Sequence, residues 1–151
     1  MKLKDLIGKR IVDILIKLES EPYGLDKADC FIVLDNGKTI GIPFGVNDDE
    51  AWTRELHKNA VSVFNQPKWW QAYNKPVLEL KDTIIVDIIS YPDNWPDKSL
   101  LLLDNKKLIT EVLVAPQGTG HAGLWWYNSL ADVENKYGNK YDRFSELKGS
   151  V

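Results

Sequence analysis

His121 is the side chain whose position in the sequence best suits acid–base chemistry. It lies in the glycine-rich segment 118–123, GTGHAG, and loops of this kind leave side chains accessible to a substrate. A histidine that acts as a general acid or base needs a partner within hydrogen-bond reach, and Asp87 and Glu111 are the carboxylates that we consider. Such a pair would make the chain a hydrolase-like enzyme, and we keep this function as an alternative.

The same glycines match the Gly-x-Gly-x-x-Gly pattern of dinucleotide-binding loops. That chemistry needs a helix that opens on the glycines, so that its amides and dipole meet a pyrophosphate. Residues 124–127, LWWY, follow the glycines here, and an aromatic run of this kind is typical of a strand. We therefore expect a loop between two strands and no nucleotide cofactor.

Asp13 and Asp87 share their context, because Ile-Val-Asp-Ile occurs at 11–14 and again at 85–88. Two carboxylates across an axis can share a proton, as in aspartic proteases, but the Asp-Thr/Ser-Gly motif of that family is absent. We expect both to be outward-facing strand residues. No metal site is expected either, because His57, His121 and the single cysteine Cys30 lack the spacing of metal ligands.

The chain contains six tryptophans, and most of them are clustered. Adjacent residues of a strand point to opposite faces, so we expect one of the two neighbours at 125 and 126 to lie outside the core. The neighbours at 69 and 70 diverge by about 100° in a helical turn, with the same expectation. Because tryptophan and tyrosine dominate interface hot spots, we predict that a partner is contacted by Trp69, Trp70, Trp95, Trp125 and Trp126. Stacking of a sugar on an indole face is the competing use.

Two segments between predicted strands are longer than a tight hairpin needs, and both carry acidic side chains. They span residues 19–29 and 91–97, and their candidate binding residues are Asp26, Asp29, Asp93 and Asp97. Loops on a rigid scaffold commonly carry recognition. A basic partner such as a nuclease would be steered toward them electrostatically.

A degenerate internal duplication is predicted to position these residues. Besides the repeated Ile-Val-Asp-Ile, Leu-Asp-Asn-Gly-Lys at 34–38 recurs as Leu-Asp-Asn-Lys-Lys at 103–107, and Pro-Phe-Gly at 43–45 is echoed by Pro-Gln-Gly at 116–118. The matches keep their order along the chain. We therefore infer two copies of one unit, residues 6–45 and 80–118.

Each copy is predicted to form three antiparallel strands joined by tight turns, the first of them at Asn36-Gly37. Alternating apolar residues place these strands at 11–18, 30–34 and 38–42, and at 83–90, 100–103 and 108–114. Helices are expected at 48–64 and at 130–137, the second between Ser129 and Gly138, and the tail after Asn139 is expected to be loosely held. The predicted fold is α+β: the two units form a curved sheet or partly open barrel with the long helix on one face, in a single domain of residues 1–151.

Composition limits the class of partner. The chain has 151 residues, 44% of them hydrophobic and 27% charged, as expected for one globular domain. Its formal net charge of −3 argues against nucleic acid, because nucleic-acid binders carry a basic excess. No signal-like segment and no apolar run of about 18 residues is present, so we expect cytoplasmic residence without a membrane.

These observations favour a non-enzymatic protein-binding module that acts by occlusion. A bacterial immunity protein that neutralises a cognate basic toxin, such as a nuclease, would have this rigid sheet, these acidic loops and these aromatic anchors. A small-molecule or carbohydrate-binding domain with its cavity between the two copies is the first alternative, and an enzyme using His121 is the second. Whether the chain forms a homo-oligomer is left open by the sequence.

Overall fold

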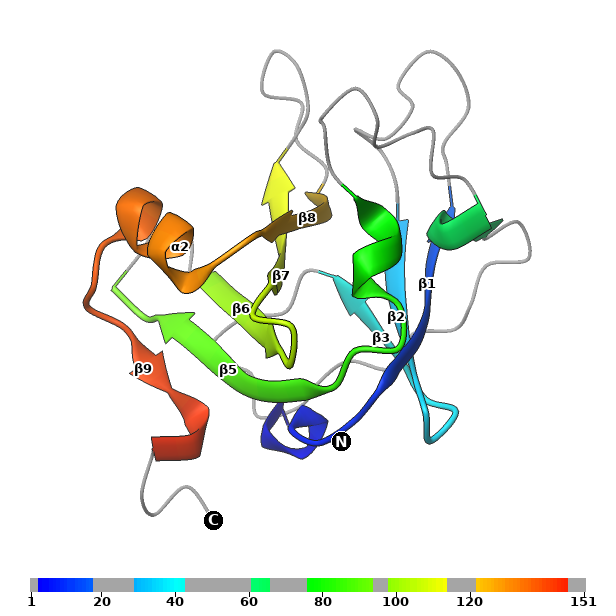
Figure 1. The fold of residues 1–151 in the computed structure, drawn as a ribbon, viewed down its shortest axis with the longest axis horizontal. Helices are drawn as coiled ribbons and strands as arrows, with labels where there is room; N and C mark the ends of the chain where they lie inside the picture. Colours follow the sequence, from blue (N-terminus) through cyan, green and yellow to red (C-terminus); the bar gives the residue numbers. More distant parts are fainter. Residues whose placement is uncertain are drawn as a thin grey trace.

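The part of the fold that the structure describes consists of two antiparallel sheets, a covering α-helix and short 3-10 turns (Figure 1). The computed structural model describes residues 3–17, 29–42, 61–65, 76–93, 98–113 and 122–146. In chain order, the elements of these residues are η1 (Leu3–Leu6), β1 (Ile11–Lys17), β2 (Asp29–Leu34), β3 (Thr39–Ile42), β4 (Val61–Ser62), η3 (Val63–Asn65), η4 (Val77–Leu80), β5 (Ile85–Tyr91), β6 (Lys98–Leu103), β7 (Leu108–Leu113), β8 (Ala122–Tyr127), α2 (Leu130–Tyr137), β9 (Asp142–Arg143) and η6 (Phe144–Glu146).

The strands form a four-stranded N-terminal sheet and a five-stranded C-terminal sheet. The N-terminal sheet has the order β3-β2-β1-β4, and the C-terminal sheet has the order β8-β7-β6-β5-β9. All pairings within both sheets are antiparallel. Figure 1 shows α2 and β9 on the left, β5–β8 of the C-terminal sheet in the middle, and β1–β3 on the right. The predicted α+β class and the six predicted strands are confirmed, with slightly displaced strand ends.

The turns that join β2 to β3 and β6 to β7 have the same local geometry. The side-chain oxygen of Asn36 accepts the N–H two residues further on at 3.0 Å, and that of Asn105 does the same at 3.2 Å. The next residue has a positive φ in both turns, 83° at Gly37 and 74° at Lys106. Lysine in the second turn thus adopts a backbone conformation that glycine adopts at less cost.

A β-bulge near the start of β1 and another near the start of β5 change which side chains face the core. The pairing register shifts between residues 11 and 13 and between residues 85 and 87. Consequently Ile11 and Ile14 are both fully buried, although they are separated by two residues. The strict alternation predicted for residues 11–18 is therefore wrong at this point, because a bulge inserts one extra residue into the pleat.

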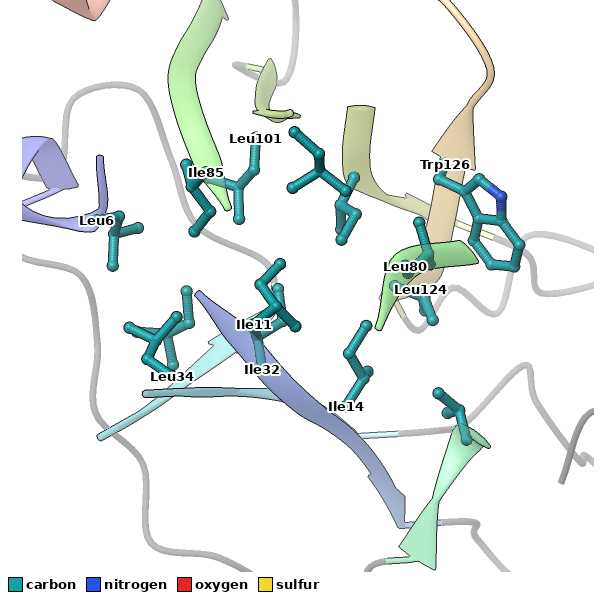
Figure 2. Packing of buried hydrophobic residues seen from close by; sticks show 14 of the residues in the cluster. Leu6, Ile11, Ile14, Ile32, Leu34, Leu80, Ile85, Leu101, Leu124 and Trp126 are labelled. Atoms are coloured by element: carbon teal, nitrogen blue, oxygen red, sulfur yellow. The ribbon is translucent and has the colours of Figure 1, made fainter. Parts of the chain in front are cut away.

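The main core lies between the two sheets (Figure 2). Ile11 and Ile32 of the N-terminal sheet face Ile85 and Leu101 of the C-terminal sheet. Trp126 of β8 belongs to the same cluster and is fully buried. The two sheets therefore share one apolar core, while the predicted curved sheet or partly open barrel stays a prediction.

The α2 helix covers the outer face of the C-terminal sheet. Its Val133 is fully buried in a second apolar cluster, which includes Ile89 of β5. The helix begins after Ser129, whose hydroxyl accepts the N–H of Asp132 at 3.2 Å, and it ends at Gly138 with φ 94°. The helix predicted at 130–137 is confirmed together with both of its caps. No helix within the described ranges combines the length and apolarity needed to cross a bilayer.

The long helix predicted at 48–64 is wrong at its C-terminal end. Residues 61–62 form β4, which pairs with β1, and residues 63–65 form η3. Ser62 of β4 also donates its hydroxyl to Asp13 at 2.6 Å. Strand pairing and this bond outweigh the helical spacing of the apolar residues. Residues 48–60 lie outside the described residues, so the rest of this helix stays a prediction.

The segment after Asn139 is held by the sheet, so the prediction of a loosely held tail is wrong for residues 141–146. Its β9 pairs with β5, with Arg143 opposite Ile89. Ser145 in η6 donates two hydrogen bonds to Asp87. The segment is thus ordered by strand pairing, by the buried carboxylate of Asp87 and by the packing of Tyr141 and Phe144 against the two apolar clusters.

Backbone hydrogen bonds join the two sheets where β1 and β5 begin. The N–H of Gly8 donates to the carbonyl of Ile85 at 2.7 Å, and the N–H of Asp82 donates to the carbonyl of Ile11 at 2.8 Å. Both donors have a positive φ, 92° at Gly8 and 61° at Asp82. The same unusual backbone conformation therefore occurs on the two sides of the junction.

Candidate functional site

A pocket of about 380 Å³ lies between the end of β8 and α2. Aromatic residues of β8 and polar residues of α2 and the intervening turn line it: Trp125, Trp126, Tyr127, Asn128, Asp132, Asn135 and Lys136. We call this pocket the β8–α2 groove. Aromatic residues bordered by polar ones are typical of protein interfaces and of ligand pockets.

The alternation of β8 places its two tryptophans on opposite faces. Trp126 is 0% exposed and lies in the core between the sheets. Trp125 is half-buried, and so is Tyr127, which packs against the cluster under α2. The prediction that one of Trp125 and Trp126 lies outside the core is confirmed, and Trp125 is the half-buried one.

The walls of the groove are held by contacts within the chain. The hydroxyls of Tyr127 and Tyr137 are 3.3 Å apart, and the two rings meet edge to face with centroids 6.2 Å apart. Lys107 donates to the side-chain oxygen of Asn128 at 2.9 Å and pairs with Glu79 at 2.9 Å. A groove whose walls are already ordered loses less conformational entropy when it binds.

The rim of the groove on α2 carries two opposite charges. Asp132, Asn135 and Lys136 are all exposed, and spacings of three and four residues place them on one side of the helix. In the described part of the chain, neither the carboxylate of Asp132 nor the ammonium of Lys136 has an ion-pair or hydrogen-bond partner. Their Cα atoms are separated by about 6 Å along the helix axis, since each residue rises about 1.5 Å.

Tyrosines behind the groove anchor α2 to the sheet. The hydroxyl of Tyr91 donates to the carbonyl of Gly138 at 2.8 Å, and that of Tyr141 donates to Glu134 at 2.9 Å. Burial, followed by the proximity of Tyr141 and Glu134, raises the pKa of Tyr91 to about 12. Burial and the hydrogen bond to Glu134 also raise the pKa of Tyr141. These hydroxyls therefore stay protonated at neutral pH and support the helix.

Asp87 is a structural residue, and the prediction that it faces outward is wrong. It is only 5% exposed, and it accepts the N–H of Ile88 at 2.8 Å. Its carboxylate also accepts the N–H and the hydroxyl of Ser145 at 3.1 and 2.7 Å, and the guanidinium of Arg143 lies 3.7 Å away. Because both carboxylate oxygens are engaged, Asp87 is poorly suited to act as the acid–base partner considered for His121.

Asp13 has the matching arrangement in the N-terminal sheet. It accepts the N–H of Ile14 at 2.8 Å and the hydroxyl of Ser62 at 2.6 Å, and it is half-buried. Its neighbour Ile14 belongs to the core cluster, so Asp13 lies on the other face of the strand, as predicted, with its carboxylate engaged. At both positions the bulge turns the carboxylate toward the backbone N–H of the next residue and toward a neighbouring edge strand or turn.

The structure brings only part of the predicted binding set together. Trp125 and Trp126 border the groove, whereas Asp93 is exposed in the segment after β5 and does not line the groove. Asp29 begins β2, and its side chain lies outside the described part. The remaining predicted residues lie outside the described residues altogether: His121, Trp69, Trp70, Trp95, Asp26 and Asp97. Their roles stay predictions, and so does that of Glu111.

Sequence reasoning missed the polar rim of the groove. Asn128, Asp132, Asn135 and Lys136 line it, but an exposed polar helix face carries no signal of binding by itself. The available signal was their position directly after an aromatic strand, combined with their spacing on one side of a well-capped helix.

No group of three or more His, Cys, Asp or Glu side chains is placed to hold a metal ion within the described ranges. No family model, no curated protein and no solved structure matches this chain.

Proposed function

We propose that the chain is a protein-binding module and that the β8–α2 groove is its binding face. The observation that carries the proposal is the half-buried Trp125 beside Tyr127, set below the polar rim of α2. Aromatic anchors that are partly buried before binding contribute contact area at little cost in side-chain entropy, and they are enriched among interface hot spots. A polar rim around them excludes water from the contact.

Within this function, we propose an immunity-type role: the module covers the working surface of a basic toxin, such as a nuclease, in the bacterial cytoplasm. The formal net charge of −3 supports this proposal, because a negatively charged chain attracts a positively charged partner. Asp93 and Asp132 are exposed acids that a basic partner would meet. Opposite charges on two partners raise the rate of association and suppress wrong partners.

We also propose that the two sheets are copies of one unit related by a pseudo-twofold axis, which would make the binding platform stiff. Three pairs of observations support this. The bonds from Gly8 to Ile85 and from Asp82 to Ile11 are reciprocal across the junction, where Arg10 and Ile84 also form an isolated bridge. The second pair is formed by the carboxylates of Asp13 and Asp87, each of which follows a bulge and accepts the N–H of the next residue. The third pair is formed by the two turns after β2 and β6, each of which contains a residue with positive φ.

Site-specific photo-crosslinking in cells that naturally produce the chain tests the binding function. A benzophenone amino acid replaces Asn135 in the groove or, as a matched control, Asn36 in the exposed turn of the N-terminal sheet. We expect one crosslinked protein of defined mass from position 135 and little from position 36. Equal labelling at the two positions, or crosslinks only between copies of the chain, would contradict the proposal.

Carbohydrate binding is a second candidate, because one specific feature favours it. The half-buried indole of Trp125 lies near Asn128, Asp132 and Asn135, and an aromatic face beside amide and carboxylate groups suits a sugar. A thermal-shift screen with mono- and oligosaccharides tests this, since a ligand of the native state raises its melting temperature. The same shift in a Trp125→Ala variant would show that the sugar binds elsewhere.

A further inference from the structure

We infer that Asn128 determines which chemical group the β8–α2 groove accepts, because its side-chain amide donates a hydrogen bond to a carbonyl oxygen of the protein partner. Lys107 is a positioning residue in this arrangement, since it fixes which end of the amide the partner meets. The inference rests on the proposed protein-binding function and specifies the chemistry of the contact.

The register of two strands brings Lys107 and Asn128 together. Leu108, the first residue of β7, pairs with Tyr127, the last residue of β8. The next residue outward on each strand, Lys107 and Asn128, therefore lies opposite the other. The Nζ of Lys107 donates to the Oδ1 of Asn128 at 2.9 Å.

Lys107 is itself held in place by contacts on both its side chain and its backbone. Its Nζ lies 2.9 Å from the Oε2 of Glu79 in η4, and its side chain is only 12% exposed. Its N–H donates to the side-chain oxygen of Asn105 at 3.2 Å, and its carbonyl accepts the N–H of Leu103 at 2.8 Å. Bonds between an ammonium and a carboxylate are among the stronger hydrogen bonds, so the ammonium is kept beside Asn128.

The chemistry of an ammonium sets the orientation of the Asn128 amide. A lysine ammonium has donors and no acceptor, so the amide faces it with its oxygen. The Nδ2 group, with its two N–H donors, then forms the other end of the amide. Asn128 is exposed and lines the groove, and within the described part of the chain its Nδ2 group has no acceptor. These donors are therefore left for a partner.

A neutral carbonyl oxygen is the group that fits these donors. The rim of the groove carries one carboxylate, Asp132, and one ammonium, Lys136, so it does not select a partner group of one charge. A carbonyl accepts hydrogen bonds and cannot donate them, and every residue of a protein partner carries one. A sugar hydroxyl differs, because it both donates and accepts and would tolerate a reversed bond.

The Asn128→Asp variant tests the inference on the full chain, because it replaces both N–H donors by an acceptor of nearly the same shape. The protein recovered by crosslinking from position 135 is purified, and its dissociation constant is measured by isothermal titration calorimetry. We expect binding to weaken at least about tenfold, which corresponds to about 1.4 kcal/mol. The melting temperature should not fall, since a carboxylate accepts from Lys107 more strongly than an amide does. Asn36→Asp adds the same charge in the exposed turn of the N-terminal sheet and should bind as the wild type does.

Substitutions of Lys107 test its positioning role. Lys107→Met removes the ammonium and frees the amide to turn, so we expect binding to weaken about threefold or more. Lys107→Arg supplies a donor-only cation again and should restore binding. Lys106→Met is the matched control, because it removes a charge from the neighbouring exposed lysine and should leave binding unchanged. Circular dichroism checks that each variant retains the fold.

Unchanged or tighter binding by Asn128→Asp would overturn the inference, because Asn128 would then only brace Lys107. Equal losses in Asn128→Asp and Asn36→Asp, or in Lys107→Met and Lys106→Met, would show an effect of net charge and also overturn it. A saccharide that stabilises the wild type and Asn128→Asp equally would assign the groove to hydroxyl groups, with the same consequence.

The failure of the inference is distinguishable from that of the proposed function. If position 135 recovers a protein that Asn128→Asp binds as the wild type does, the proposed function stands and only the role of Asn128 fails. If position 135 recovers no protein, the proposed function fails and the inference fails with it.

Discussion

Ser145 donates two hydrogen bonds to Asp87, one from its N–H at 3.1 Å and one from its hydroxyl at 2.7 Å. These bonds fix the C-terminal segment to the first strand of the C-terminal sheet. The carboxylate is 5% exposed, so its hydrogen bonds are made where water competes little. In the N-terminal sheet, Ser62 meets Asp13 through a single bond from its hydroxyl at 2.6 Å.

Removal of the Asp87 carboxylate should destabilise the fold more than removal of the Asp13 carboxylate. We expect Asp87→Ala to lower the free energy of unfolding by about 3 kcal/mol, because the buried N–H of Ile88 and the part-buried N–H and hydroxyl of Ser145 lose a charged acceptor. Asp13→Ala is the matched control, with an expected loss of about 1.5 kcal/mol, since that site is half-buried. Urea unfolding measures both values, and equal losses would contradict the structural account of Asp87.

The two tryptophans of β8 should separate stability from binding. Trp126→Ala removes a fully buried ring and is expected to cost about 3–5 kcal/mol of folding free energy. Trp125→Ala should cost about 1 kcal/mol, because its ring is half-buried, but it should strongly reduce crosslinking from position 135. Unfolding midpoints and crosslink yields are measured on both variants. Undiminished crosslinking in the Trp125→Ala variant would remove the main support for the groove.

Substitutions at the positive-φ positions of the two matched turns should shift the free energy of unfolding in opposite directions. Lys106 has φ 74°, so Lys106→Gly should raise the free energy of unfolding by about 0.5–1 kcal/mol. Gly37 has φ 83°, and no described atom lies within 4 Å of a Cβ added there, so the cost of Gly37→Ala is conformational alone. We expect a loss of about 1 kcal/mol. Thermal unfolding checks both variants, and a destabilising Lys106→Gly would show that the lysine side chain matters more than its backbone.

Tyr91 should make the fold sensitive to alkaline pH. Its pKa is raised from 10.0 to about 12 in the folded chain, so between these values the unfolded state ionises while the folded state does not. The stabilisation is complete below pH 10 and is lost as pH rises toward about 12, by up to about 2.7 kcal/mol at about 1.36 kcal/mol for each unit.

The Tyr91→Phe variant isolates this effect. At pH 8 it should be less stable by about 1 kcal/mol, because the hydrogen bond to the Gly138 carbonyl is lost. Its stability should then fall less steeply than that of the wild type above pH 10. Parallel pH dependences for the two proteins would contradict the assignment to Tyr91.

Local signals in the sequence predicted the strands and α2 well. Asn36-Gly37 specifies its hairpin because the glycine tolerates a positive φ, and Ser129 and Gly138 specify both ends of α2. Period-two patterns located the strands. They could not reveal the bulges before Asp13 and Asp87, because a bulge depends on the partner strand and on the serine that meets the carboxylate.

Contacts between distant segments account for the errors. Residues 61–64 have helical spacing, but residues 61 and 62 pair with β1 and residues 63–65 form η3. Residues 141–146 are ordered by β5, by Asp87 and by the packing of Tyr141 and Phe144. The sequence predicted the aromatic residues of the candidate site but not its polar residues. Trp125 follows from alternation along a strand, whereas Asp132 and Lys136 belong to the groove only because α2 packs beside β8.

Hydrogen–deuterium exchange tests the central claim, that a protein partner binds at the β8–α2 groove, most directly. The full chain is measured alone and in complex with the protein recovered by crosslinking from position 135. We predict that protection on binding is concentrated in residues 122–128 of β8 and its turn and in residues 130–137 of α2, while the turn at Asn36-Gly37 exchanges as before. Protection confined to the N-terminal sheet or to the segment around Asp93, with β8 unchanged, would contradict the claim.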